Sequence, residues 1–148
     1  FAVATFHRPA NVDNPERLDE IRKLLEHVAG QLPVVFPVHP RTLERLKRLP
    51  GGESLFNDPR IRTSQPLSYV EFANLVARSR LVVTDSGGIQ EEASWLGIPC
   101  FTLRDTTERP ITVTHGSAPG WTRSISTPWS SGIGRISSPY IRWRTLMM

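Results

Sequence analysis

Short apolar segments alternate with helix-like segments along residues 1–116. The apolar segments are expected to form buried strands at 1–6, 33–38, 60–63, 81–84 and 98–103. The segments between them have the length and the apolar spacing of helices. Strands that are separated by helical crossovers form a parallel sheet with helices on both faces. We therefore predict an α/β, Rossmann-like fold.

Capping residues predict where the helices begin and end. The first long helix is expected to begin at Asp13 or Asn14 and to end at Gly30. Ser68 and Glu71 have the spacing of a capping box, which predicts the start of a further helix. Shorter helices are expected over 42–49 and 88–96.

Trp95 and Cys100 are expected to be structural. Trp95 falls on the last expected helix, where packing is favoured over stacking on a ligand. Cys100 lies within an apolar strand, which favours a core position over a nucleophilic role. As the only cysteine, it forms no internal disulfide, which fits a reducing cytosol.

The positive charge of the chain is confined to its last residues. The formal net charge is +4, but residues 1–116 hold 14 basic and 14 acidic side chains. Residues 117–148, called here the basic tail, hold four Arg and no acidic residue. The basic tail has neither helical nor strand periodicity and is predicted to be out-of-frame or disordered. We therefore expect no nucleic-acid partner. No apolar run approaches the ~20 residues of a membrane span, so no membrane association is expected.

Polar residues follow the predicted strands at the point where each strand ends. His7 and Arg8 follow the first strand and His39 follows the second. The later clusters are 65–69, 85–88 and 104–109. The carboxyl ends of parallel strands lie at one edge of the sheet, where ligands of such folds bind. The sequence therefore predicts a binding crevice at this edge.

The segment Ser86-Gly87-Gly88 lies between a strand and a helix and favours an anionic ligand. Glycines let a ligand approach the backbone, and the N–H groups of a first helical turn attract phosphate. The alternative is that the glycines form only a tight turn and that the serine only caps the helix.

Charged residues near this segment suit a nucleotide. Arg8, Arg104 and Arg109 would neutralise phosphate charge. Glu92, one turn into the helix, would accept hydrogen bonds from sugar hydroxyls. Together these residues strengthen the prediction of a phosphate-bearing ligand.

His7 and His39 are candidate acid–base residues, because imidazole exchanges protons near neutral pH. Pro37 and Pro40 flank His39 and restrict its backbone. A structural role is the alternative for both histidines. The histidines and the single cysteine lack the spacing of metal ligands, so no metal site is expected.

Four segments together resemble the non-hydrolysing UDP-N-acetylglucosamine 2-epimerase family over residues 1–116. They are Thr-Phe-His-Arg at 5–8, Pro-Val-His-Pro at 37–40, Thr-Asp-Ser-Gly-Gly-Ile-Gln-Glu-Glu at 84–92 and Arg-Asp-Thr-Thr-Glu-Arg-Pro at 104–110. The resemblance implies that residues 1–116 are the C-terminal UDP-binding domain of a glycosyltransferase-B-like enzyme, with the N-terminal domain absent. Alone, this chain is expected to bind UDP weakly and to lack activity.

The resemblance also implies the reaction. UDP-GlcNAc is converted reversibly to UDP-ManNAc by elimination and re-addition of UDP, without a metal or redox cofactor. It further implies a cytoplasmic, bacterial enzyme of polysaccharide biosynthesis that forms a homodimer and has UDP-GlcNAc and UDP as its ligands.

Residue roles follow from the matching motif positions. The resemblance implies that Ser86, Gly87, Gly88 and Glu92 hold the diphosphate and ribose and that Phe72 lies near the uridine.

The remaining matched positions are histidines and arginines of the strand ends. His7 matches the active-site histidine of the family, and His7, Arg8 and His39 match a second, regulatory UDP-sugar site of some bacterial members. A supporting loop is expected to contribute Arg104, Thr107, Glu108 and Arg109.

Three other functions remain open at this point. They are a glycosyltransferase of the same architecture, a hydrolysing epimerase that releases free N-acetylmannosamine, and a non-catalytic UDP-binding fragment. The pair of motifs at 84–92 and 104–110 favours the epimerase over the glycosyltransferase.

Overall fold

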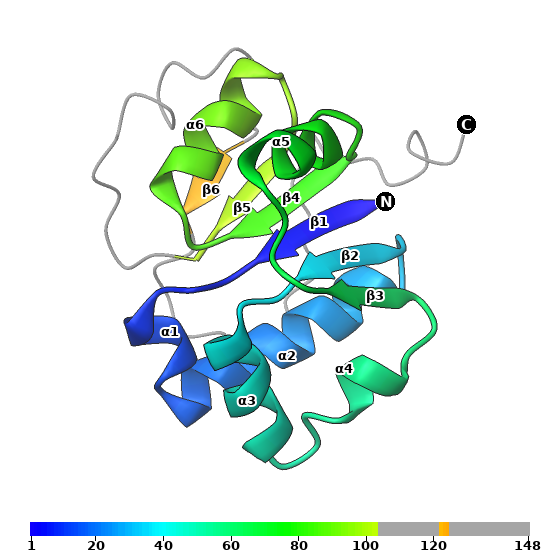
Figure 1. The fold of residues 1–148 in the computed structure, drawn as a ribbon, viewed down its shortest axis with the longest axis vertical. Helices are drawn as coiled ribbons and strands as arrows, with labels where there is room; N and C mark the ends of the chain where they lie inside the picture. Colours follow the sequence, from blue (N-terminus) through cyan, green and yellow to red (C-terminus); the bar gives the residue numbers. More distant parts are fainter. Residues whose placement is uncertain (104–121, 125–148) are drawn as a thin grey trace.

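A six-stranded parallel sheet with helices on both faces organises the chain (Figure 1). The structure, a computed structural model, describes residues 1–103 and 122–124. The strands are β1 (Ala2–Thr5), β2 (Val34–Pro37), β3 (Ile61–Ser64), β4 (Leu81–Thr84), β5 (Cys100–Thr102) and β6 (Thr122–Ser124). Their order across the sheet is β3-β2-β1-β4-β5-β6, and each neighbouring pair is parallel. The predicted α/β, Rossmann-like fold is confirmed.

The helices divide between the two faces of the sheet. One face is covered by α2 (Pro15–Ala29), α3 (Pro40–Arg48) and α4 (Ser54–Asn57), and the other by α5 (Tyr69–Ala77) and α6 (Gly87–Trp95) (Figure 1). The one-turn helix α1 (Pro9–Val12) follows β1. Helices therefore shield the central strands from water on both sides, as a parallel sheet requires.

Successive residues of the central strands pack into different cores. Ala2 and Ala4 of β1 belong to the core beneath α2, whereas Val3 belongs to the core beneath α5 and α6. In β4, Val83 belongs to the core beneath α2 and Val82 belongs to the core beneath α5 and α6. This two-residue alternation explains why both strands are apolar along their whole length.

The caps agree with the sequence-based expectations. Asn14, one of the two expected candidates, caps α2 with an Oδ1 atom that accepts from the N–H groups of Glu16 and Arg17. Ser68 and Glu71 form the predicted capping box at the start of α5. The strands lie within two residues of their predicted bounds.

Three short elements were not expected from the sequence. Helices α1 and α4 span four residues each, which is too short for a periodic pattern. Strand β6 falls within the basic tail and pairs with β5. The other residues of the basic tail lie outside the described residues, so its predicted disorder stays a prediction.

The expected packing of Trp95 is wrong, because its side chain is 88% exposed. Ala93, two residues earlier, lies on the buried face of α6. Two residues turn a helix by about 200°, so a residue two places beyond the buried face points away from it. Cys100 is buried, as expected.

Candidate functional site

The chain reverses its direction of winding between β1 and β4, which are neighbours in the centre of the sheet. In open parallel sheets, a ligand crevice forms beyond the carboxyl ends of the strands at such a switch point. His7 follows β1, and Asp85 and Ser86 follow β4. The predicted site residues of these two turns therefore meet at the centre of the C-terminal edge, the edge where the strands end.

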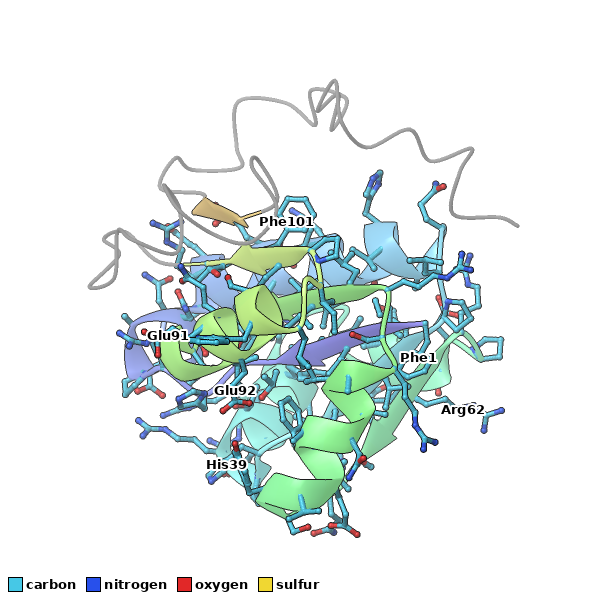
Figure 2. All side chains as sticks on the ribbon, turned by 90° about the horizontal axis from the view of Figure 1, so that it is seen from above. Phe1, His39, Arg62, Glu91, Glu92 and Phe101 are labelled. Atoms are coloured by element: carbon cyan, nitrogen blue, oxygen red, sulfur yellow. The ribbon has the colours of Figure 1, made fainter. Side chains whose placement is uncertain are left out.

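Two further predicted residues, His39 and Glu92, lie at the same edge. Figure 2 shows both, with Glu91 next to Glu92, on the side of the molecule opposite Phe1 and Arg62. Phe1 and Arg62 belong to the ends at which β1 and β3 begin. Because β3, β2, β1 and β4 all run parallel, the clusters that directly follow these strands share this edge, as expected.

Asp85 connects the two turns at the switch point. Its side chain is completely buried. Its carboxylate accepts hydrogen bonds from the backbone N–H of His7 at 3.2 Å, the backbone N–H of Arg8 at 2.9 Å and Asn11 Nδ2 at 3.0 Å. A buried carboxylate needs such donors to offset its lost hydration. The turn after β1 is therefore held against the turn after β4.

His7 extends from this connection toward solvent. Its side chain is 52% exposed, and its Nδ1 lies 3.3 Å from Asp85 Oδ1. One ring nitrogen thus faces a buried acid. The half-exposed ring places His7 where it can contact a ligand at the C-terminal edge.

The N-terminus of α6 lies beside these residues in the turn after β4. Ser86 is the N-cap, and its Oγ accepts from the N–H of Ile89 at 3.5 Å. Among the described glycines only Gly51 and Gly97 have positive φ, so backbone conformation does not require glycine at Gly88. The helix dipole and the N–H groups of the first turn can bind an anion here.

Glu92 and Phe72 lie on the two helices that cover one face of the sheet. Glu92 lies on the second turn of α6 and is half-buried. Phe72, on α5, is also half-buried and packs partly against the core beneath α5 and α6. Phe72 therefore has a packing role, and part of its side chain remains accessible to a ligand.

His39 has a structural role that the sequence left open. It is the N-cap of α3, and its Nδ1 accepts from the N–H of Arg41 at 3.3 Å. The predicted loop residues lie outside the described residues: Arg104, Thr107, Glu108 and Arg109.

Asp85 and Asn11 were not among the predicted site residues. Asp85 lies within the matched segment 84–92, and Asn11 lies three residues after the matched segment 5–8. Asn11 Nδ2 also donates to the carbonyl of Leu103 at 3.2 Å, which brings the end of β5 into the same network. The available sequence signal was an acidic residue directly after the apolar segment Leu81–Thr84. An acid in that place is buried and needs a specific set of donors.

Two kinds of feature are absent from the described residues. They contain no group of three or more His, Cys, Asp or Glu side chains that could hold a metal ion. No helix in the described ranges is both long enough and apolar enough to cross a membrane.

Comparison with known sequences points to one family. The sequence model described as UDP-N-acetylglucosamine 2-epimerase matches residues 1–119. The UDP-N-acetylglucosamine 2-epimerase of Methanocaldococcus jannaschii is 42% identical over 119 residues, which are 79% of this chain and 32% of that protein. The UDP-2,3-diacetamido-2,3-dideoxy-D-glucuronate 2-epimerase of Pseudomonas aeruginosa is 43% identical over 118 residues, with the same coverage of 79% and 32%. The chain thus spans about a third of the length of these relatives.

Solved structures agree with the sequence matches. The M. jannaschii epimerase in complex with UDP-GlcNAc and UDP superposes with a TM-score of 0.72 at 41% identity, covering 82% of this chain and 33% of that one. An Escherichia coli heptosyltransferase superposes with a TM-score of 0.60 at 18% identity, covering 86% of this chain and 37% of that one. The second likeness concerns the fold alone, a Rossmann-like sheet that resembles one half of a glycosyltransferase-B-like fold.

Proposed function

The chain belongs to the UDP-N-acetylglucosamine 2-epimerase family, and from this premise we propose that it supplies the UDP-binding part of an enzyme that interconverts UDP-GlcNAc and UDP-ManNAc. The observation that carries the proposal is the helix N-terminus at Ser86-Gly87-Gly88, set at the switch point beside His7. A diphosphate would lie against the first turn of α6, where N–H groups and the helix dipole favour negative charge.

The other nucleotide contacts come from the flanking helices. Glu92 would accept hydrogen bonds from the ribose hydroxyls, and Phe72 would contact the uracil through the accessible part of its ring. The hydroxyl group of Ser86 would donate a hydrogen bond to a phosphate oxygen. These roles are supported by the half-buried positions of Phe72, Ser86 and Glu92.

The proposed reaction breaks and remakes two bonds of the sugar. A base removes the C2 proton while the C1–O bond to UDP breaks, which leaves a 2-acetamidoglucal. UDP then adds back to C1, and a proton returns to the opposite face of C2. The first turn of α6 and Arg8 would stabilise the charge on departing UDP, and His7 would exchange a proton with the reacting groups.

A second substrate is favoured by one observation. The Pseudomonas relative, whose name specifies a diacetamido glucuronate, is as similar to this chain as the M. jannaschii relative. Both sugars carry UDP, so the proposed contacts of α6 serve either. Displacement of bound UDP by each UDP-sugar in turn would rank the two substrates.

Calorimetric titration of the 148-residue chain with UDP tests the proposal. UDP is expected to bind more tightly than UMP, and UMP more tightly than uridine, because each phosphate adds contacts to the helix N-terminus. ADP serves as the control for base recognition and is expected to bind more weakly than UDP. Absence of UDP binding, or a preference for ADP, would contradict the proposal.

The proposal includes a homodimer in the cytoplasm as the working assembly. The family resemblance supports the homodimer. The single cysteine, whose reduced state suits the cytoplasm, supports the compartment. Sedimentation of the purified chain at several concentrations would test the dimer.

A further inference from the structure

We propose that Asp85 is a positioning residue that holds the His7 ring as the tautomer protonated on Nδ1. The inference rests on the proposed acid–base role of His7 and adds the atom at which that role is performed. Its basis is the approach of His7 Nδ1 to Asp85 Oδ1 at 3.3 Å. Sequence motifs alone do not place this acid beside this ring, because the two residues lie 78 positions apart.

The surroundings of Asp85 determine which ring nitrogen carries the proton. The groups that face its carboxylate from the adjoining turn are all donors, namely the N–H of His7, the N–H of Arg8 and Asn11 Nδ2. A carboxylate offers only lone pairs. A lone pair on Nδ1, 3.3 Å from Asp85 Oδ1, would therefore oppose the lone pairs of the carboxylate, whereas a proton on Nδ1 places positive charge density next to them.

The same carboxylate fixes the backbone from which the ring extends. Asp85 also binds the backbone N–H groups of His7 and Arg8, so the Cα of His7 is held close to the carboxylate that its Nδ1 approaches. A proton on Nδ1 leaves the lone pair on Nε2. Since half of the His7 side chain is exposed, Nε2 is the atom available to take up or return a proton of a ligand at the C-terminal edge.

His39 provides a contrast within the same molecule. Its Nδ1 accepts a hydrogen bond from the backbone N–H of Arg41, so its neutral ring carries the proton on Nε2. The two histidines follow neighbouring strands, yet their environments select opposite tautomers. One spectrum of the chain therefore contains both the test case and its reference.

Nitrogen-15 NMR of the histidine rings tests the proposal on the 148-residue chain. At a pH where the rings are neutral, His7 is expected to show a protonated Nδ1 and His39 a protonated Nε2. The variants H7Q and H39Q assign the two sets of signals by removing one set each. A wild-type His7 ring protonated on Nε2 would overturn the proposal.

Replacement of the acid provides the second test. In D85N the His7 ring is expected to change to the Nε2-protonated tautomer, while His39 keeps its signals. D58N is the matched control, since it makes the same change in an exposed pair with Arg60. A His7 tautomer that is unchanged in folded D85N would overturn the proposal. If D85N does not fold, the spectrum of the wild-type chain still shows which nitrogen of the His7 ring carries the proton.

The outcome is separable from that of the proposed function. Titration with UDP tests the ligand, and the ring spectrum of the free chain tests the tautomer. Binding of UDP with His7 protonated on Nε2 would reject only the role of Asp85. The expected tautomer without UDP binding would reject only the proposed ligand. A purely structural role of Asp85 would lower stability in D85N without changing the tautomer.

Discussion

A Cβ atom built on Gly88 would lie 3.9 Å from the Oγ of Ser86 and would meet no closer atom. Ala therefore fits at Gly88, where φ is not positive, and it favours helix by up to about 1 kcal/mol over Gly. We predict that G88A is as stable as wild type or slightly more stable. We also predict that it loses at least about tenfold in UDP affinity, or ~1.4 kcal/mol, because the added methyl group occupies the proposed phosphate position. Urea denaturation and calorimetry measure the two effects.

Gly97 supplies the matched control for this prediction. It lies just beyond the end of α6, with φ at +68° and nothing within 4 Å of a built Cβ. G97A is therefore expected to cost about 1–2 kcal/mol through backbone strain and to leave UDP affinity unchanged. Wild-type affinity in G88A would contradict a phosphate site at the first turn of α6.

The second prediction concerns the bond that ties α3 to the end of β1. The buried Thr42 hydroxyl donates to the carbonyl of Phe6 at 2.9 Å. T42V keeps the shape but leaves this carbonyl without its donor, and we expect a loss of about 2 kcal/mol of unfolding free energy. T42S keeps the hydroxyl and is expected to lose about 1 kcal/mol or less. Equal stability of T42V and wild type in urea would contradict this account.

Much of the fold was predictable because local patterns decide it. In β1 and β4 the apolar sequence agrees with the buried positions of the strands. At the start of α5 the spacing of Ser68 and Glu71 agrees with the capping box that forms there. Local sequence could not decide whether Asn14 or Asp13 caps α2. Asp13 is engaged with Arg41 of α3, a contact that depends on tertiary packing.

The candidate site was predictable only in part, for the same reason. Motifs placed His7 and Ser86 at strand ends, and the switch point brought those ends together. The role of Asp85 required knowledge that β1 and β4 are neighbours, which is a property of the strand order. Trp95 was wrongly expected to pack because its position on the outer side of α6 depends on where the buried face lies.

The third prediction follows from the buried thiol of Cys100. Burial raises its pKa from 9.0 to about 11, and the Thr102 hydroxyl offsets this slightly. The folded chain therefore keeps a proton that the unfolded chain releases. This contribution to stability is complete below about pH 9 and is lost as the pH rises to about 11. The two pKa units correspond to about 3 kcal/mol.

Comparison with C100A isolates this contribution from that of other groups that titrate at alkaline pH. The unfolding free energy of wild type is expected to fall more steeply between pH 9 and pH 11 than that of C100A, which has no thiol to ionise. Thermal or urea unfolding at several pH values measures the difference in slope. Parallel curves for the two proteins would show that the thiol does not contribute.

The last prediction separates the two roles of His39. As the N-cap of α3 it accepts one backbone hydrogen bond, and Asn is among the best residues for that role. We expect H39A to lose about 1 kcal/mol of unfolding free energy and H39N to retain the wild-type value. A second UDP-sugar that needs the imidazole would instead be lost in both variants. Urea denaturation together with titration by UDP-GlcNAc therefore distinguishes a capping residue from a ligand-binding one, and equal destabilisation of H39A and H39N would contradict the capping role.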